Sequence, residues 1–564
     1  MRKLYFDLME KVLEAYSLEH IRRYTDTVLK NGLEEHGFPR LTANIGILIS
    51  HGRKTELKDD FIKMMDLCCS EIPVALGING INVGNDFSVK EIVFCLLEVE
   101  KARIVEKEIT EQWREKLAKI NPYTTYSKIA SVPPKPIDNW AAFGAASEQV
   151  RKYAGIGDES VFIEDQMKAL LLCFDENGMF CDPGNPIVYD LVTRLQFAIA
   201  LYFGFEGESR DALEENLLKS ADMTLKMQSV TGELPFGGRS IQFLHNETLF
   251  TALCEYYAGV FKQKGDLDKA GQFKSAAKRA VESILPWLQE KPIRHIRNYY
   301  EVDSGFGCEG YAYYDKYMIT VASWLYMAYM MADDAVEEVD FLAKEKAYIC
   351  ETSDSFHKVF CRFGDYFVEL DTRASSIYDA SGVGRIHKKG APSTICMSVP
   401  FCKNPKYKID ISNPSYLSIS GAIKKGEEWM YTYDYQTEYQ LVEKHITDRL
   451  VQVKFACKIE EDIVCYQTCT VSEDGVEICF EGPGELKLMF PLFDFDGKQQ
   501  VSNSLSENSA EVIYKGYKCQ YTSEDEMVLT EDVYANRNGR YKAAAVCGKD
   551  SISLKVAITK DIQY

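Results

Sequence analysis

Four segments of the sequence place acids, bases and tyrosines where a helical pattern follows a loop. Loops of this kind lie at the rim of a domain and usually carry binding or catalytic groups. Acids, bases and hydrogen-bond donors gathered at one rim could move protons to and from a bound substrate. The four segments span residues 138–140, 185–194, 239–247 and 294–317.

The first two segments combine an aromatic wall with charged groups. Asn139 and Trp140 begin a helical pattern, and the indole face of Trp140 could form a flat wall for a sugar ring. Tyr189, Asp190 and Arg194 follow a loop rich in Pro and Gly. The i, i+4 spacing of Asp190 and Arg194 also fits a plain helical ion pair, worth about 0.3–0.5 kcal/mol. We favour a site in which a phenol, a carboxylate and a guanidinium group share one rim.

The third segment carries one of only eight histidines in the chain. Asn246 and Glu247 follow His245 directly. Arg239 comes before His245 in the sequence and directly follows two glycines. An ordinary capped helix start with a buried histidine is the alternative explanation. The Gly-rich loop favours a pocket in which His245 and Glu247 act as acid or base, while Arg239 and Asn246 bind substrate.

The fourth segment begins with a dense basic cluster formed by Arg294, His295 and Arg297. A guanidinium group binds a carboxylate through two parallel hydrogen bonds, and the C6 group of a uronic acid supplies such a carboxylate. A solvated basic loop is the alternative. The segment then adds an acid and two aromatic residues able to stack on sugar rings, namely Glu309, Tyr311 and Tyr313.

The elements that must position these segments are helices. Up to about residue 335, apolar residues recur with the helical period. The sequence shows no repeat of fixed length, which argues against an α-solenoid. Long loops at 175–186, 231–239 and 292–309 suit a binding site. We expect an (α/α) toroid of about six helical hairpins. The predicted helices lie near 1–15, 17–32, 57–70, 87–100, 106–119, 139–154, 160–174, 188–204, 210–228, 242–264, 267–289 and 311–334.

After about residue 355 the period of the apolar residues changes to two. Val451, Val453 and Phe455 alternate with polar residues, which is typical of a strand with one buried face. A series of short strands without helices between them implies an antiparallel β-sandwich. The expected fold class is therefore α+β and multidomain, with a catalytic toroid at 1–335, a linker at 336–355 and a sandwich at 356–564.

Composition narrows the partners and the compartment. A net charge of −20 argues against nucleic acid as the main partner, although a locally basic cleft could still bind an anionic sugar. Nucleotide-binding, zinc-protease and nucleophile-elbow motifs are missing, so we expect no cofactor and no metal. The N-terminal stretch is amphipathic and no stretch is apolar enough to span a membrane, so we expect no membrane partner. The seventeen cysteines are odd in number, which is more typical of free thiols in the cytoplasm than of disulfides, so we expect a cytoplasmic protein.

The sequence also resembles a known family. Part of the chain, residues 139–317, is similar to glycoside hydrolase family 154. The similarity lies in Asn139-Trp140, in Tyr189-Asp190, in the residues that lead to Glu247 and in the residues around Glu309. That family shares its toroid-plus-sandwich plan with polysaccharide lyases of the heparinase II/III and rhamnose-glucuronate lyase kind. The resemblance implies a β-glucuronidase that releases glucuronic acid from uronate-containing oligosaccharides. The sequence is also compatible with a homo-oligomer.

Two reactions and one non-catalytic role fit these residues. Hydrolysis would use two carboxylates from the set Glu309, Asp190 and Glu247. β-Elimination would use Tyr189 or His245 as base or acid, while the side chains Asn139, Asn246 and Arg194 neutralise the uronate. The resemblance favours hydrolysis. A helical scaffold that binds proteins would instead point these loop residues in different directions. In either enzyme, we expect the four segments to meet at one anionic-sugar cavity.

Overall fold

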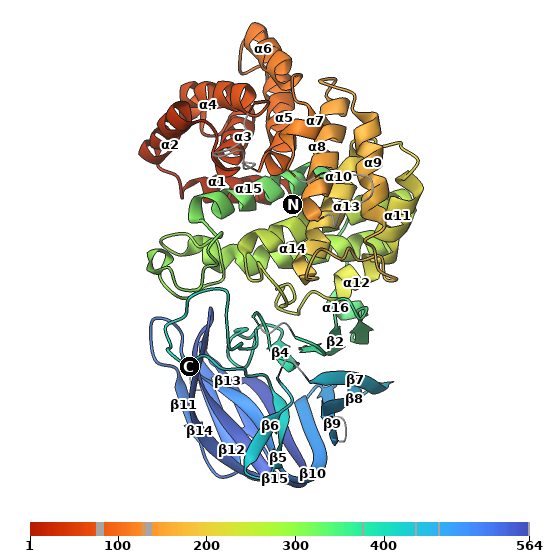
Figure 1. The fold of residues 1–564 in the computed structure, drawn as a ribbon, viewed down its shortest axis with the longest axis vertical. Coiled ribbons are helices and arrows are strands. Elements are labelled where there is room, and N and C mark those ends of the chain that lie inside the picture. The colour runs from red at the N-terminus through yellow and green to blue at the C-terminus, as the bar shows by residue number, and fades with distance from the viewer. Residues whose placement is uncertain are drawn as a thin grey trace. The chain divides into compact units, whose positions relative to one another are not determined.

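The chain forms two compact units, shown in Figure 1. The computed structural model describes residues 1–74, 84–127, 129, 138–374, 377–434, 437–460 and 463–561. The first unit comprises Met1–Asp222, Phe243–His295 and Ala312–Val339, and the second comprises Met223–Gln242, Ile296–Tyr311 and Asp340–Tyr564. Two segments from the helical part of the sequence, 223–242 and 296–311, therefore belong to the unit that carries the sheets.

The first unit contains a closed ring of helices. Within the described chain, each helix of this ring packs against the next, and the last packs against the first. The ring helices, in order, are α3 (Gly37–Ser50), α5 (Asn85–Ala102), α8 (Asn139–Tyr153), α10 (Ile187–Tyr202), α13 (Leu244–Gln263) and α15 (Tyr314–Met331). This arrangement confirms the expected (α/α) toroid.

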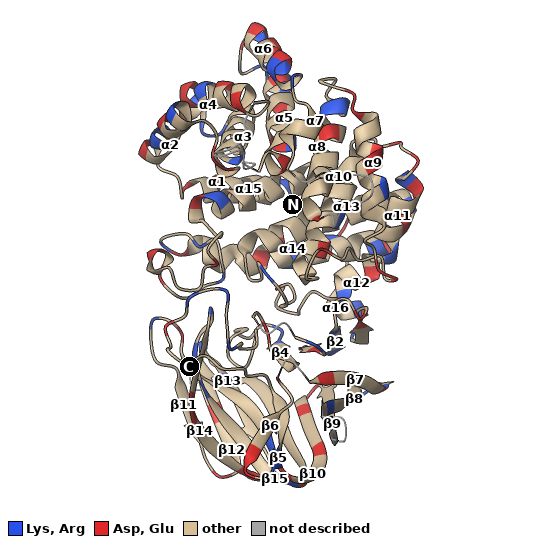
Figure 2. Ribbon diagram, viewed as in Figure 1, with Lys and Arg blue, Asp and Glu red and all other residues tan. Residues whose placement is uncertain are grey.

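A second layer of helices covers the outside of the ring. Outer helices pack against the ring helices or against each other, as α1 does on α15 and α14 on α13. The outer and connecting helices are α1 (Arg2–Leu13), α2 (Leu18–Asn31), α4 (Lys58–Glu71), α6 (Lys107–Leu117), α7 (Pro122–Thr125), α9 (Ser160–Leu171), α11 (Arg210–Lys219), α12 (Ala221–Lys226) and α14 (Leu267–Gln289). Figure 2 shows Lys, Arg, Asp and Glu concentrated on outer helices such as α2, α4, α6 and α11.

Burial explains which helices the sequence pattern revealed. The outer helix α6 buries one face, through Thr110, Trp113 and Leu117, so its apolar residues recur with the helical period. The inner helix α3 buries every residue from Gly37 to Ile49. A helix buried on all sides has no polar face and hence no such period. α3 is missing from the predicted helices, whereas the other main helices, including the almost fully buried α10, are confirmed to within a few residues.

The second unit is built on two antiparallel sheets. The smaller has the order β1-β2-β3-β4, and the larger has the order β11-β12-β13-β15-β10-β9-β8-β7, with β14 on β15, β5 on β10 and β6 on β5. The smaller sheet comprises β1 (Ala347–Glu351), β2 (Lys358–Phe363), β3 (Tyr366–Asp371) and β4 (Gly382–Lys388). A four-residue helix, α16 (Phe341–Lys344), precedes it. This unit confirms the predicted antiparallel second half.

The larger sheet follows the predicted alternation. Its strands are β5 (Ser420–Lys425), β6 (Glu428–Tyr431), β7 (Glu438–Ile446), β8 (Leu450–Glu460), β9 (Ile463–Ser472), β10 (Gly475–Phe495), β11 (Ser502–Leu505), β12 (Ser509–Tyr514), β13 (Tyr517–Thr522), β14 (Glu526–Asn536) and β15 (Gly539–Lys560). Val451, Val453 and Phe455 of β8 are fully buried, as expected for one face of a strand. Across the described ranges, no helix is both long and apolar enough to cross a bilayer.

Candidate active site at the N-terminal ends of the inner helices

The N-terminal ends of the inner helices lie at one end of the ring. From α3 to α13, each inner helix is followed by an outer helix that packs against it, and rings at the starts of α3, α5, α8, α13 and α15 lie close to one another. A helix N-terminus carries a partial positive charge and unpaired backbone N–H groups, both of which attract anions. Side chains in the first turns of these helices therefore lie where an anionic ligand is favoured.

Aromatic and imidazole side chains at the starts of five inner helices form a row at the end of the toroid where the N-termini lie. His245 of α13 stacks on Tyr317 of α15 with ring centroids 5.5 Å apart, and Tyr317 meets His36, which precedes α3, at 6.2 Å. His36 lies 4.9 Å from Phe87 of α5, and Phe87 lies 4.6 Å from Trp140 of α8. Two predicted site residues, His245 and Trp140, are thus linked through three that the sequence analysis did not select.

A buried arginine lies beside this row. Arg40 Nε is 3.0 Å from Glu91 Oε1, and Arg40 Nη1 donates to Thr320 Oγ1 at 2.8 Å and lies 3.1 Å from His36 Nδ1. The other oxygen of Glu91 accepts a hydrogen bond from Ser323 at 2.6 Å. Glu91 is thus held by two partners from different helices. Its pairing with Arg40 fixes the guanidinium group close to the imidazole of His36.

His245 has an unused nitrogen in this setting. The residue is 7% exposed, and its Nδ1 has no hydrogen-bond partner among the described residues. Burial, followed by the charges of Arg40 and His295, lowers the pKa of His245 to about 3. Burial also lowers the pKa of His36, again with a contribution from Arg40. Both imidazoles are therefore neutral at pH 7, and His245 keeps a free nitrogen that could accept a proton.

Asn139 is held by a carboxylate at the start of α8. Asp182 Oδ1 accepts from the Asn139 backbone N–H at 2.8 Å and from the Asn139 side-chain Nδ2 at 3.1 Å. Asp182 itself is fully buried. These contacts tie the loop before α10 to the first turn of α8. They fix the position of Trp140, which is the next residue and is only half-buried.

Asp190 and Arg194 form a buried ion pair inside the helical layer. Both side chains have no exposed surface, and Arg194 Nη2 and Nε lie 2.5 and 2.8 Å from the two oxygens of Asp190. Asp190 also accepts from Phe180 N–H at 2.7 Å, and Arg194 donates to Ser220 and Tyr257. The pair therefore ties the loop before α10 to three helices. Asp190 and Arg194 therefore have a structural role rather than the predicted catalytic and substrate-binding ones, because neither side chain has any exposed surface.

The remaining candidates of the first unit differ in exposure. Asn246, Glu247, Arg294 and His295 are buried, Tyr189 is half-buried at the start of α10, and Tyr313 is 65% exposed. His295 joins two helix starts, because its carbonyl accepts from Leu244 N–H at 3.0 Å and its Nε2 lies 3.0 Å from the Ala312 carbonyl. A structural role accounts for these contacts of His295.

Glu309 lies in the second unit and faces a buried arginine. The guanidinium group of Arg537 pairs with Glu309 Oε2, and it also donates to the carbonyls of Gly307 and Ile241 at 2.5 and 2.7 Å. Tyr407 lies under the same guanidinium group at 4.2 Å. Arg537 thereby holds two loop segments together. Glu309 Oε1 has no hydrogen-bond partner in the part of the chain that the structure describes.

Three further candidates also belong to the second unit. Arg297 Nη1 lies 4.0 Å from Glu233 Oε1, and Tyr311 shares a 2.5 Å hydrogen bond with Ser240. Arg239 is half-buried. Burial raises the pKa of Glu233, but Arg297, His387 and Arg385 outweigh it and lower that pKa to about 2. The predicted carboxylate clamp at Arg297 therefore already has a carboxylate beside it.

The Gly-rich loop before α13 is fixed to the smaller sheet of the second unit. Arg385 donates to Leu234 O at 2.8 Å, Phe236 N–H donates to Glu369 at 3.1 Å, and Gly238 N–H donates to Asp379 at 3.2 Å. The loop is mostly buried rather than a mobile rim. Its polar backbone is satisfied by charged side chains, as buried backbone requires.

This packing predicts a strong effect at a glycine of β4. The Cβ of Gly384→Ala would lie 2.3 Å from Phe236 Cζ, so the loop or the strand must shift. Overpacking of this kind costs about 1–3 kcal/mol, and we expect a melting temperature several degrees lower. Gly259→Ala is the control, because nothing lies within 4 Å of the added methyl group in α13. Equal melting temperatures for the two variants would contradict this description of the loop.

Sequence reasoning missed His36, Arg40 and Tyr317. A signal for Arg40 was present, because an arginine in an otherwise apolar helix must have a buried partner. His36 and Arg40 are also spaced i, i+4 at the start of α3. Tyr317 lay in the tyrosine-rich stretch of the fourth segment, but nothing in the sequence distinguished it from Tyr311 or Tyr313.

Comparison with known proteins supports the fold. No protein-family model and no curated protein matches the sequence. The chain is similar to a mutant of the heparan sulfate lyase HepC from Pedobacter heparinus, with a TM-score of 0.50, 10% identity and coverage of 93% of this chain and 76% of that chain. The HepC structure itself gives a TM-score of 0.49 with the same identity and coverage. The chondroitin lyase ODV-E66, a baculovirus envelope protein, gives 0.45 at 8% identity, with coverage of 93% and 76%.

The match to the HepC mutant shows a shared fold, and the resemblance to glycoside hydrolase family 154 is not confirmed. At 10% identity, the similarity to the HepC mutant concerns the arrangement of helices and sheets alone. Within the described residues, no three His, Cys, Asp or Glu side chains are grouped so that they could hold a metal ion.

Proposed function

We propose that the chain is a carbohydrate-active enzyme that cleaves uronate-containing oligosaccharides by β-elimination at the N-terminal ends of the inner helices. The observation that carries this proposal is His245, a neutral imidazole with an unused nitrogen, stacked on Tyr317 and close to Arg40. The shared fold with a protein named as a heparan sulfate lyase agrees with it. β-Elimination is therefore our leading proposal, ahead of the hydrolysis that the family resemblance favours.

Each step of the elimination has a group to perform it. A base removes the proton at C5 of the uronate, and His245 is our candidate for that base. The charge then develops on the uronate carboxylate, where the helix N-termini and Arg40 would stabilise it. The C4–O bond breaks, the oxygen leaves with a proton from an acid, and a C4–C5 double bond forms. Tyr317 is our candidate for the acid, since its ring lies against His245.

The low pKa of free His245 does not prevent this role. That pKa is low because of burial first, and then because of the electrostatic influence of Arg40 and His295. A bound uronate brings a negative charge into the same region and would raise the pKa of His245 again. The imidazole would thus gain basicity only when a carboxylate-bearing substrate is present. A neutral sugar would not have this effect, which favours uronates as substrates.

Hydrolysis is less well supported because it requires two available carboxylates. Asp190 is enclosed by Arg194 and Phe180, and Glu309 is paired with Arg537. Glu247 is the remaining candidate, and it is 2% exposed. We therefore keep a β-glucuronidase as the second proposal and assign Glu247 as its acid.

Ultraviolet absorbance distinguishes the two reactions. Elimination creates an unsaturated uronate that absorbs in the ultraviolet, whereas hydrolysis creates none. We expect a steady rise in absorbance when the protein is incubated with uronate-containing oligosaccharides, and no aryl release from an aryl β-glucuronide. Aryl release without absorbance would support the glucuronidase instead. A protein that does neither across a panel of uronate glycans would fit the non-catalytic scaffold.

A further inference from the structure

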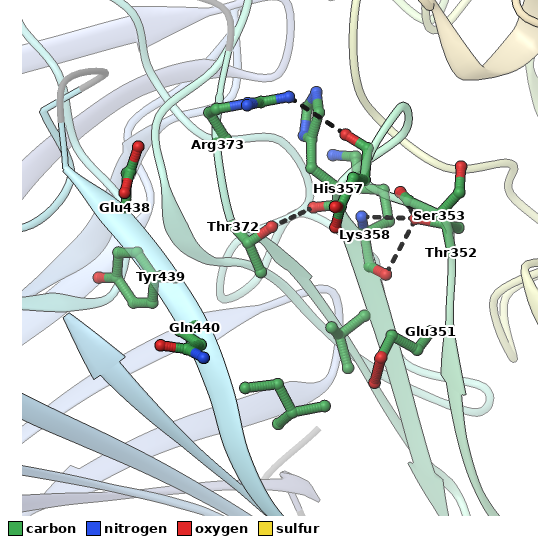
Figure 3. Close-up of a pocket in the computed structure, with 13 residues that line it drawn as sticks. Glu351, Thr352, Ser353, His357, Lys358, Thr372, Arg373, Glu438, Tyr439 and Gln440 are labelled. Carbon is green, nitrogen blue, oxygen red and sulfur yellow. Dashed lines mark hydrogen bonds between the residues drawn. The ribbon is translucent and has the colours of Figure 1, made fainter. Parts of the chain in front are cut away.

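A pocket of about 450 Å³ lies in the second unit, at the ends of β1, β2 and β3 beside β7. Figure 3 shows its walls. His357 and Arg373 lie on the side of the smaller sheet, and Glu438 and Gln440 of β7 lie opposite them. Small-molecule sites usually occupy about 300–1,000 Å³, so the volume suits a single sugar residue or two.

The wall that carries His357 is built rigidly. His357 has a φ of 48°, a left-handed conformation that costs energy in a residue other than glycine. Its backbone N–H donates to Ser353 O at 2.9 Å, and its carbonyl accepts from Thr372 N–H at 2.9 Å. Its Nδ1 lies 2.6 Å from Asp371 Oδ1. These three contacts fix the imidazole and leave Nε2 without a partner in the described part of the chain.

Arg373 is fixed beside His357 without a carboxylate partner. Its backbone N–H donates to Asp371 Oδ1 at 3.0 Å, and its Nη2 donates to the Asp354 carbonyl at 3.1 Å. Within the described residues, no acid lies within ion-pair distance of this guanidinium group. Most of its N–H donors are therefore available to a ligand. A guanidinium group in this state is suited to two parallel hydrogen bonds with a carboxylate.

The opposite wall offers groups that bind hydroxyls. The side chains of Glu438 and Gln440 project from the same face of β7, two residues apart, and neither has a hydrogen-bond partner among the described residues. Carboxylate and amide groups accept and donate hydrogen bonds to sugar hydroxyls. Val359 and Leu441 add an apolar surface to the pocket lining. A complementary ligand thus carries an anion at one end and hydroxyls at the other.

We propose that this pocket is a second, non-catalytic saccharide site that holds one uronic acid residue, with its carboxylate on Arg373 and its hydroxyls on His357 Nε2, Glu438 and Gln440. The choice of a uronate, rather than another hydroxylated carboxylate, rests on the proposed function. The site is formed entirely by residues of the second unit. It would bind the glycan without contributing to its cleavage.

The test uses the full-length protein, D-glucuronic acid as the probe, and D-glucose and acetate as comparisons. Hydrogen exchange should slow at residues 372–374 and 438–441 when glucuronic acid is added, and not with glucose or acetate. With Arg373→Ala, at least ten times more glucuronic acid should be needed to reach the same protection. Arg449→Ala is the matched control, because Arg449 is an exposed arginine of the same unit that does not line the pocket. No protection in the unmodified protein, or equal effects of the two variants, would overturn the proposal.

The same experiment separates this proposal from the catalytic one. Protection of the pocket in a protein that shows no elimination would leave the saccharide site and remove the proposed reaction. Elimination accompanied by protection from exchange only at the start of α13 would support the proposed reaction and remove the second saccharide site. Arg373→Lys adds a further check, since it keeps the charge but removes the paired donors. Its protection should fall between those of the unmodified protein and Arg373→Ala, and unchanged protection would overturn the proposed guanidinium contact.

Discussion

His245→Gln should lower the turnover of a uronate oligosaccharide by about a thousandfold, since general base catalysis usually contributes about 10²–10⁴. Glutamine keeps a polar side chain at the start of α13 but cannot accept the C5 proton. The KM should change little, because binding would depend on the helix N-termini rather than on this imidazole. The measurement is the initial rate of ultraviolet absorbance over a range of substrate concentrations.

A matched variant controls for the loss of a histidine. His445 has a side chain that is 59% exposed, in β7 of the other unit, and His445→Gln should leave turnover unchanged. Tyr317→Phe keeps the ring against His245 and removes the hydroxyl, so it should reduce turnover while preserving the fold. Retention of more than a tenth of the activity by His245→Gln, with an unchanged melting temperature, would remove His245 as the base.

The pH dependence gives this prediction a second readout. Because the pKa of His245 is lowered to about 3 in the folded protein, its imidazole stays neutral down to about pH 4. The kcat/KM, which reports the free enzyme, should therefore not fall with a midpoint near 6.5 as the pH decreases from 8 to 5. Folding disfavours the protonated form, so this histidine reduces stability progressively as the pH falls below about 6.5. A bell-shaped profile with its acidic limb near 6.5 would contradict the assignment.

The sequence predicted the fold where helices or strands have two different faces. The outer helix α6 shows its apolar positions Trp113 and Leu117 against a charged background, and β8 alternates between buried and polar residues. The inner helix α3 has no such contrast, because all its surfaces are covered by protein. α3 also contains Gly37 and Gly46, and glycine is a poor helix former. Gly46 is instead required, since a Cβ there would lie 2.3 Å from Phe61 and 2.4 Å from Cys95.

The candidate site was only partly predictable for a related reason. His245 and Trp140 stood out because they are rare residues at helix starts after loops. His36 and Arg40 lie at the start of α3, the helix that periodicity did not reveal, so nothing in the sequence placed them near His245. Asp190 and Arg194 were placed correctly at a helix start. Whether an i, i+4 pair points to solvent or into the protein depends on what surrounds the helix, and spacing alone does not contain that information.

Asp190→Asn should therefore be among the most destabilising single changes in the first unit. It leaves the Arg194 guanidinium group buried beside a neutral amide, and breaking a buried pair in this way costs about 3–5 kcal/mol. For a domain of this size, that corresponds to a decrease in melting temperature of roughly 10 °C. Differential scanning calorimetry of the full-length protein is the measurement.

The chain offers an exposed i, i+4 ion pair for comparison. Arg210 and Glu214 are also spaced i, i+4 and lie 3.0 Å apart, but their side chains are 48% and 41% exposed. Glu214→Gln should cost less than about 1 kcal/mol, because exposed pairs contribute little. If the Asp190–Arg194 pair is structural, Asp190→Asn should lose stability far more than Glu214→Gln and still turn over substrate at low temperature, where it remains folded. An Asp190→Asn protein with an unchanged melting temperature and a thousandfold lower rate would instead return Asp190 to the catalytic residues, and hydrolysis to the leading reaction.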